Sequence, residues 1–207
     1  MMKRGLLIAL EGPDGCGKST QIELLQEYFN KKNIEVIRTR EPGGTSISEQ
    51  IRGVVLDNKN SEMNGMCEAL LYAASRAQLV SEVLKPAIEA GKVVLCDRFV
   101  YSSIAYQGIG RGLGIDRVKM INDAALDGLE ADLVFMISIP YDKGLERKKK
   151  QKELDRLENA GDDFHKKVFD GYSKIMKIYD KIEVINGDDT IENIHNTIVN
   201  KIEELLK

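Results

Sequence analysis

Residues 12–19 read GPDGCGKS, between an apolar run at Leu6–Leu10 and a stretch of helical spacing at Gln21–Asn33. The spacing matches GxxxxGK[ST] in the strand–turn–helix context that this motif requires. Its glycines let the backbone bend until several N–H groups surround one anion, and the helix dipole adds to the attraction. We interpret the segment as a phosphate-binding loop made of Gly12, Pro13, Asp14, Gly15, Cys16, Gly17, Lys18, Ser19 and Thr20.

Three side chains of this loop have predicted chemical roles. Lys18 would contact the β- and γ-phosphates of ATP, and the Ser19 hydroxyl would ligate Mg²⁺. Cys16 lies near Lys18 and the helix N-terminus, surroundings that favour a reactive thiolate. We therefore expect alkylation of Cys16 to inactivate the protein and bound Mg·ATP to protect it. The alternative is that Cys16 is a small residue packed beneath the loop.

The rest of the chain alternates between strand-like and helical segments. Apolar runs without polar alternation are typical of parallel strands covered on both faces, and they occur at Leu6–Leu10, Val36–Thr39, Val93–Cys96, Leu133–Ile139 and, more weakly, Val184–Ile185. Helical spacing is present at Gln21–Asn33, Ile47–Leu56, Glu68–Ala90, Ile115–Leu126, Phe164–Tyr179 and Ile191–Leu206. Pro86 should kink or divide the longest of these. The pattern predicts a doubly wound α/β fold whose ligands bind at the carboxyl ends of the strands.

Composition limits the classes of function. The 207 residues fit a single domain, and a formal net charge of −3 argues against a nucleic-acid partner. No apolar run approaches the roughly 20 residues of a membrane span. Cys16, Cys67 and Cys96 are far apart, which predicts neither disulfides nor a zinc site and suits a reducing cytoplasm.

A second polar segment follows the third apolar run. Asp97 and Arg98 come directly after Val93–Cys96, where a parallel sheet binds its ligands. Asp97 can hold Mg²⁺ or its waters, and Arg98 can contact a phosphate through two parallel hydrogen bonds. The alternative is a solvated ion pair. A GTPase switch is disfavoured, because no DxxG occurs outside the loop and residues 58–61, NKNS, lack the Asp of a guanine-binding NKxD.

Five segments together carry a resemblance to a known family. GPDGCGKST, TREPGGT, LLYAASRAQ, DRFVYSSIAYQG and ELDRLE, in this order between residues 12 and 158, resemble bacterial thymidylate kinases. The resemblance implies ATP-dependent phosphorylation of thymidine monophosphate to the diphosphate in dTTP biosynthesis, with Mg²⁺ as cofactor. It also implies a five-stranded parallel sheet, a mobile lid at about residues 141–160 and a homodimer. The alternatives are another nucleoside monophosphate kinase, a deoxynucleoside kinase, or a non-catalytic ATP-binding module.

The resemblance also assigns an acceptor site. Tyr72 would stack on thymine while Arg76, one helical turn away on the same face, hydrogen-bonds a ring carbonyl. Tyr106 would crowd the sugar C2′, and Glu41 precedes a proline that resembles the cis-proline of the family. The implied contacts with the acceptor phosphate are Arg40, Arg52 and Arg98. Ser103 and Gln107 would line the pocket of the base and the phosphate, and Asp14 would lie near the sugar 3′-hydroxyl and the metal.

A run of basic residues near the end of the resemblance can stabilise the negative charge that develops during phosphoryl transfer. Residues 147–156 read RKKKQKELDR, which by itself indicates a solvated basic face. Relatives carry either an arginine in the phosphate loop or basic residues in the lid, and this chain has Gly15 at the loop position. The resemblance therefore implies that Arg147 or Lys149 stabilises the transferring phosphoryl group, together with Lys18 and Arg98. Arg156 would contact the adenine or its phosphates.

Overall fold

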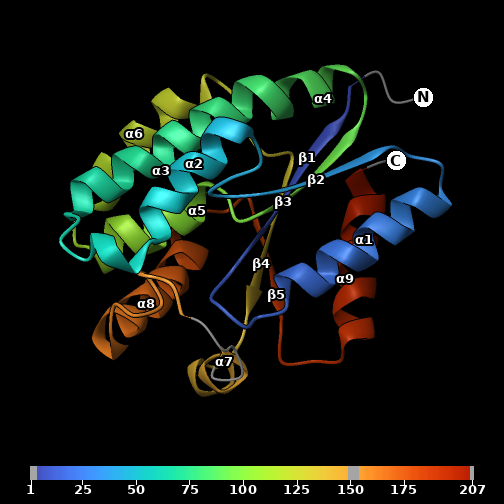
Figure 1. The fold of residues 1–207 in the computed structure, drawn as a ribbon. Coiled ribbons are helices and arrows are strands. Elements are labelled where there is room, and N and C mark those ends of the chain that lie inside the picture. The colour runs from blue at the N-terminus through green and yellow to red at the C-terminus, as the bar shows by residue number, and fades with distance from the viewer. Residues whose placement is uncertain (1–3, 149–153, 206–207) are drawn as a thin grey trace.

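The computed structural model describes residues 4–148 and 154–205, and its centre is a parallel sheet (Figure 1). Its five strands are β1 (Leu6–Glu11), β2 (Val36–Arg40), β3 (Val93–Asp97), β4 (Leu133–Ser138) and β5 (Ile182–Asn186). They lie in the order β2-β3-β1-β4-β5, and every neighbouring pair is parallel. The prediction of a five-stranded parallel sheet is therefore confirmed. The central position of β1 places the loop that follows it in the middle of the carboxyl edge.

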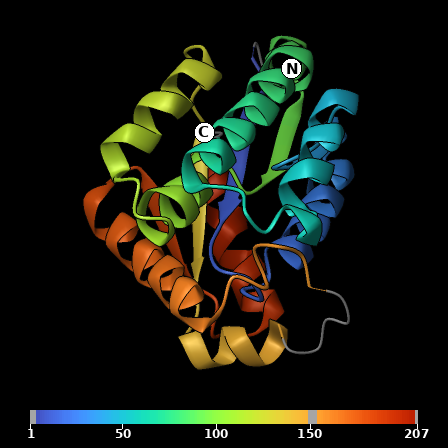
Figure 2. The same cartoon turned by 60° about the vertical axis from the view of Figure 1, so that its left-hand side comes forward.

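The sheet is covered on both faces, as its uniformly apolar strands predict. Alternate residues of β1 enter different cores: Leu7 packs in one hydrophobic cluster and Ile8 in the other. The helices α1 (Lys18–Lys31) and α9 (Ile191–Leu205) cover the Ile8 face, as Figures 1 and 2 show. The opposite face is covered by α3 (Gly65–Leu79), α6 (Ile115–Leu126) and α8 (Asp162–Ile178).

The longest helical stretch is divided, as the proline predicts. It consists of α3, a π-helical turn at Val80–Leu84 and α4 (Lys85–Glu89). Pro86 lies in the first turn of α4, where its missing N–H is tolerated. The wider π turn immediately before Pro86 accommodates the change of geometry. The sequence pattern predicts that this stretch begins at Glu68, whereas α3 begins at Gly65. Asn64 caps the helix by accepting a hydrogen bond of 2.8 Å from Cys67 N.

Two helical segments have no counterpart in the predicted pattern. One comprises α5 (Val100–Ser103) and the π helix at Ile104–Gly110. It lacks amphipathic periodicity because its middle, residues 102–108, is buried on all sides and none of its residues is exposed. The other is α7 (Tyr141–Lys148), which begins the predicted lid.

The remaining described helices are short connections near the cavity edge, α2 (Ser46–Leu56) and a 3₁₀ turn at Asn58–Asn60. Within residues 4–148 and 154–205, no helix combines the length and the apolar character needed to cross a bilayer.

Candidate active site

The glycine-rich loop joins the end of β1 to the start of α1. Gly12, Gly15 and Gly17 have φ angles of 137°, 76° and 99°, a region that side chains disfavour. A Cβ on Gly12 would lie 2.4 Å from the carbonyl oxygen of Ile137. The first turn of α1 has no acidic residue and no side-chain cap, so its amide groups are available to an anion.

Lys18 and Cys16 are both buried within this loop. The Lys18 Nζ lies 3.0 Å from the carbonyl oxygens of both Gly12 and Pro13. Cys16 is 1% exposed and belongs to the hydrophobic core between the sheet and α1. This burial supports the interpretation of Cys16 as a small packed residue rather than as an accessible thiol.

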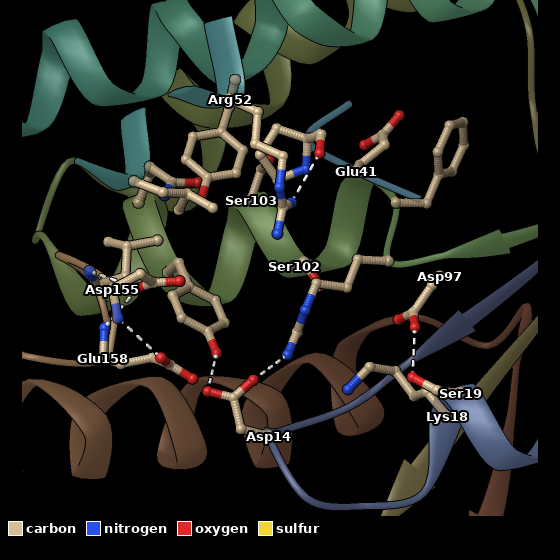
Figure 3. Close-up of a pocket in the computed structure, with 18 of the residues that line it drawn as sticks. Asp14, Lys18, Ser19, Glu41, Arg52, Asp97, Ser102, Ser103, Asp155 and Glu158 are labelled. Carbon is tan, nitrogen blue, oxygen red and sulfur yellow. Dashed lines mark hydrogen bonds and ion pairs between the residues drawn. The ribbon is translucent and has the colours of Figure 1, made fainter. Parts of the chain in front are cut away.

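The two residues predicted to bind metal lie together. Ser19 is in the first turn of α1 and Asp97 ends β3, and the Ser19 Oγ donates a hydrogen bond of 3.0 Å to Asp97 Oδ2 (Figure 3). In the described part of the chain, no group of three or more His, Cys, Asp and Glu residues forms a fuller ligand set. A hydroxyl and one carboxylate beside a phosphate loop suit Mg²⁺, which keeps waters and takes its other ligands from phosphates.

A cavity of about 480 Å³ opens beside the loop at the carboxyl ends of the strands. Its walls include Lys18 and the Ser19–Asp97 pair, and Figure 3 shows side chains from several elements converging on it. Nine of the ten residues that the resemblance assigns to the acceptor line it: Asp14, Glu41, Arg52, Tyr72, Arg76, Arg98, Ser103, Tyr106 and Gln107.

Arg40 is the residue that the structure does not bring into this cavity. Its side chain is 53% exposed and forms an ion pair of 3.0 Å with Glu49. It lines a separate hollow of about 240 Å³ on the other side of the Ser19–Asp97 pair. Because successive side chains of a strand point to opposite faces, a residue at the end of β2 cannot be placed at the cavity from its sequence position alone.

Arg98 is the centre of a hydrogen-bond network at the cavity floor. It has a φ of 67°, an uncommon conformation for a residue with a side chain. Its Nη1 donates to Gly12 O at 3.0 Å and to the Tyr172 hydroxyl at 2.9 Å, and its Nη2 pairs with Asp14. Asp14 also accepts a hydrogen bond of 3.2 Å from the Tyr106 hydroxyl. The loop, β3, the π helix and α8 are thereby joined around one guanidinium.

Arg76 is buried with its counter-ion. It is 1% exposed and forms an ion pair with Glu41, whose peptide bond to Pro42 is cis, as the resemblance implies. Burial raises the pKa of Glu41, and the charge of Arg76 opposes that shift. Each of the five N–H groups of Arg76 has a protein acceptor, on Glu41 (two bonds), Ser103, Asn122 and the Phe99 carbonyl. Contact with a base would therefore require Arg76 to share or exchange one of these bonds.

Two oxygen atoms of residues lining the cavity are buried without a hydrogen-bond partner among the described residues. They are Glu41 Oε1 and Gln107 Oε1. The Gln107 Nε2 donates a hydrogen bond of 2.9 Å to Glu68 Oε1. The π helix brings Gln107 and the neighbouring Tyr106 to the same cavity, and such turns are frequent at functional sites. Buried unpaired acceptors are costly, so both atoms are candidates for contact with a ligand.

Arg156 lies elsewhere than predicted. It is 6% exposed, pairs with Glu68 at 2.8 Å and donates a hydrogen bond of 2.8 Å to Val55 O. The structure thus places it behind the acceptor cavity rather than at the phosphate loop. Its neighbours in the ELDRLE segment also line the cavity, although no local pattern assigns them a role: Asp155, Leu157 and Glu158.

Arg147 of α7 contacts the phosphate loop. Its Nη1 donates a hydrogen bond of 3.3 Å to the carbonyl oxygen of Gly15. A Cβ on Gly15 would lie 2.9 Å from the Gly144 carbonyl oxygen, so α7 packs closely against the loop at this glycine. Arg147 also lines a hollow of about 390 Å³ beside the loop, together with Thr20 and residues of the β5–α9 connection. Lys149 lies outside the described residues.

Comparison with known proteins agrees with this geometry. The profile of the family described as thymidylate kinase matches residues 10–198. A thymidylate kinase of Lactobacillus acidophilus is 47% identical over 98% of this chain and 96% of the relative. A thymidylate kinase of Thermoanaerobacter sp. is 46% identical over 98% of this chain and 100% of the relative. One from Finegoldia magna is 45% identical over 94% of this chain and 96% of the relative. The chain therefore belongs to the thymidylate kinase family.

Proposed function

We propose that the cavity binds thymidine monophosphate beside ATP on the phosphate loop, so that the chain transfers the γ-phosphoryl group to the monophosphate. The observation that carries this proposal is that two arginines, Arg52 and Arg98, line the same cavity as Lys18 and the Ser19–Asp97 pair. A phosphorylated acceptor needs such cations, whereas a nucleoside acceptor needs a general base. Membership of the thymidylate kinase family supports thymidine monophosphate as the acceptor.

The donor would bind at the loop. Its phosphates would replace the Gly12 and Pro13 carbonyls as partners of Lys18, and the free amides of the first turn of α1 would contact them. Ser19 and Asp97 would hold Mg²⁺, which neutralises phosphate charge when bound. The hollow lined by Thr20 and Arg147 would receive the adenine end of the nucleotide.

The acceptor phosphate would lie between Arg52 and Arg98. Arg52 reaches the cavity from α2 and is held by a hydrogen bond of 2.8 Å from its Nη1 to Pro42 O. The phosphate oxygen is already anionic at neutral pH, so no side chain has to remove a proton. Catalysis then depends on positioning and on stabilisation of charge. Arg147, on the lid proposed for residues 141–160, would supply a further cation to the transferring group.

The base would bind at the far end, near Tyr72 and Gln107. The ring of Tyr72 would stack on thymine. Gln107 Oε1 is a buried acceptor without a partner in the described residues, and the thymine N3–H is a donor of the right kind. Arg76 would contact the O4 carbonyl by sharing the N–H group that it now directs at Ser103, its longest side-chain hydrogen bond at 3.2 Å.

The proposed partner of the chain is a second copy. The helices α2, α3 and α6 pack side by side, and each carries a large apolar side chain that is exposed: Ile47 (50%), Leu70 (52%) and Met120 (67%). Small residues at exposed positions of α3, Ala74 and Ala77, would let two helices approach closely. We expect Leu70→Asp to convert a dimer to a monomer in analytical ultracentrifugation. A parent protein that sediments as a monomer would contradict the proposal.

The function is tested by ADP release with a panel of acceptors. Thymidine monophosphate should be the best substrate, and deoxyuridine monophosphate, which lacks one methyl group, should be roughly 10- to 100-fold poorer. Thymidine should be inactive. A preference for thymidine would show a nucleoside kinase instead, and ATP binding without turnover of any acceptor would show a non-catalytic module. Lys18→Met serves as the control for contaminating kinases.

A further inference from the structure

Glu68, which the sequence analysis gives no function, is a fully buried carboxylate behind the base end of the cavity. It lies on α3 and is 0% exposed. Three side chains donate to it: Gln107 at 2.9 Å, Arg111 at 3.0 Å and Arg156 at 2.8 Å. A buried carboxylate is stable only when paired and hydrogen-bonded in this way. All of these partners are N–H donors, so Glu68 acts as an acceptor of hydrogen bonds.

This arrangement determines which way the Gln107 amide faces. A carboxylate has no hydrogen to donate, so the group of Gln107 that contacts Glu68 must be its NH₂. The carbonyl oxygen Oε1 then lies on the other side of the amide. Gln107 is 1% exposed and lines the cavity, and its Oε1 is buried without a partner among the described residues.

We infer that Glu68 is a positioning residue for base selection, which acts by holding the Gln107 amide with its acceptor oxygen toward the base. The inference rests on the proposed function. Thymine and uracil carry a hydrogen on N3, whereas cytosine has a lone pair there. An amide held with Oε1 toward N3 therefore accepts from the first two bases and repels the third. Discrimination against cytosine would thus originate in part from a carboxylate that does not touch the substrate.

Replacing Glu68 by glutamine should weaken this preference. The carbonyl oxygen of the amide introduced at position 68 would accept from Arg111 and Arg156, which leaves the NH₂ of that amide to face Gln107. Gln107 would then turn its own oxygen toward position 68 and its NH₂ toward the base. The NH₂ of Gln107 would then face the N3–H of thymine, so two donors would oppose each other in a buried site. This arrangement costs about 1–3 kcal/mol, which weakens binding of thymidine monophosphate roughly 10- to 100-fold.

The experiment measures kcat/KM for thymidine monophosphate and deoxycytidine monophosphate in the parent and in Glu68→Gln. The ratio of the two should fall by roughly 10- to 100-fold in the variant, and KM for ATP should stay unchanged. Because Glu68→Gln leaves two arginines without their anion and can destabilise the fold, a second variant, Glu68→Gln with Arg111→Met, removes one cation as well. It should show the same change in ratio. Arg111→Met alone is the matched control and should keep the parental ratio.

A double-mutant cycle separates positioning from a general structural effect. In a Gln107→Met background no amide remains to be oriented, so Glu68→Gln should cause no further change in the ratio. An unchanged ratio in both Glu68 variants would overturn the inference. A parent protein that does not phosphorylate thymidine monophosphate would instead refute the proposed function.

Discussion

The hydroxyl of Tyr172 offers a test of how Arg98 is positioned. Tyr172 lies on α8 and is 2% exposed. Its hydroxyl is 2.9 Å from Arg98 Nη1 and 2.8 Å from Ser102 Oγ. Because Ser102 donates its one hydrogen to Glu11, the Tyr172 hydroxyl must donate to Ser102 and accept from Arg98. Tyr172→Phe removes this one oxygen and leaves the ring in place.

The size of the effect follows from the partners that remain. Arg98 Nη1 has two hydrogens and three acceptors, because Gly12 O and Ser102 Oγ lie 3.0 and 3.2 Å away. The substitution therefore leaves no N–H unpaired. A hydrogen bond to a charged group contributes about 1.5–3 kcal/mol, and we expect the lower end of this range. That corresponds to a roughly tenfold loss in kcat/KM for thymidine monophosphate.

The assay is coupled ADP release with both substrates varied, combined with binding measurements. Thymidine monophosphate should bind more weakly to Tyr172→Phe, whereas thymidine, which lacks the phosphate that Arg98 would contact, should bind as it does to the parent. The KM for ATP should stay the same. Tyr28→Phe is the matched control, because it also removes a hydroxyl bonded to a charged group, Glu203 at 2.9 Å, between α1 and α9.

Two results would refute this reasoning. If thymidine binding falls as much as that of its monophosphate, Tyr172 supports the cavity as a whole and not Arg98. If Tyr28→Phe has the same kinetic effect, the loss reflects general destabilisation. Thermal unfolding of both variants shows whether their stabilities are comparable.

Three further predictions concern the donor side. Arg147→Ala should lower kcat by roughly 10²–10³ and, because Arg147 also lines the hollow proposed for the adenine end, should raise KM for ATP but not KM for thymidine monophosphate. Arg147→Lys should recover part of the loss in kcat; equal kcat for the parent and the alanine variant would make this arginine a surface residue. Asp97→Asn should raise the Mg²⁺ concentration needed for half-maximal activity by roughly tenfold, whereas an unchanged Mg²⁺ titration would remove Asp97 from the metal site. Iodoacetamide should modify the exposed Cys67 well before the buried Cys16, and mass spectrometry that finds Cys16 modified first would contradict the packing seen here.

The sequence predicts those features that depend on local pattern. Uninterrupted apolar runs locate the strands, and the spacing of the loop locates Lys18 and Ser19. Strand order brings Asp97 to Ser19, because β1 and β3 are neighbours and both end at the same edge. The weakest run, Val184–Ile185, lies in β5, a strand of five residues. Only some of the side chains of β5 are buried, so its sequence pattern is weak, and hydrogen bonding to β4 is what makes the segment a strand.

Contacts between distant residues are not accessible to that reasoning. Arg156 meets Glu68 across 88 positions, and Tyr172 meets Arg98 across 74. A basic run indicates charge but not which cation turns inward. The contacts of Arg156 with Glu68 and Val55 place it behind the acceptor cavity and give no support to its predicted contact with the nucleotide. The motif alone assigns Arg40 to the acceptor, whereas its ion pair with Glu49 draws it to the other side of the sheet edge.

The two halves of the site differ in how much they must change when substrates bind. Around the acceptor, Arg76 is already paired with Glu41 in a fully buried ion pair that costs several kcal/mol to break. Arg98 is paired with Asp14 in an ion pair that is partly exposed. On the donor side, Lys18 is bonded to two neutral carbonyls. A phosphate that replaces them is an anion and adds the attraction of opposite charges to the hydrogen bond with the ammonium, so the exchange is favourable. We therefore expect the acceptor cavity to keep its shape on binding, while the loop lysine and the helix that carries Arg147 rearrange around ATP. This division suits a transfer reaction, because the acceptor phosphate needs a fixed position from which to attack a donor that the protein closes around.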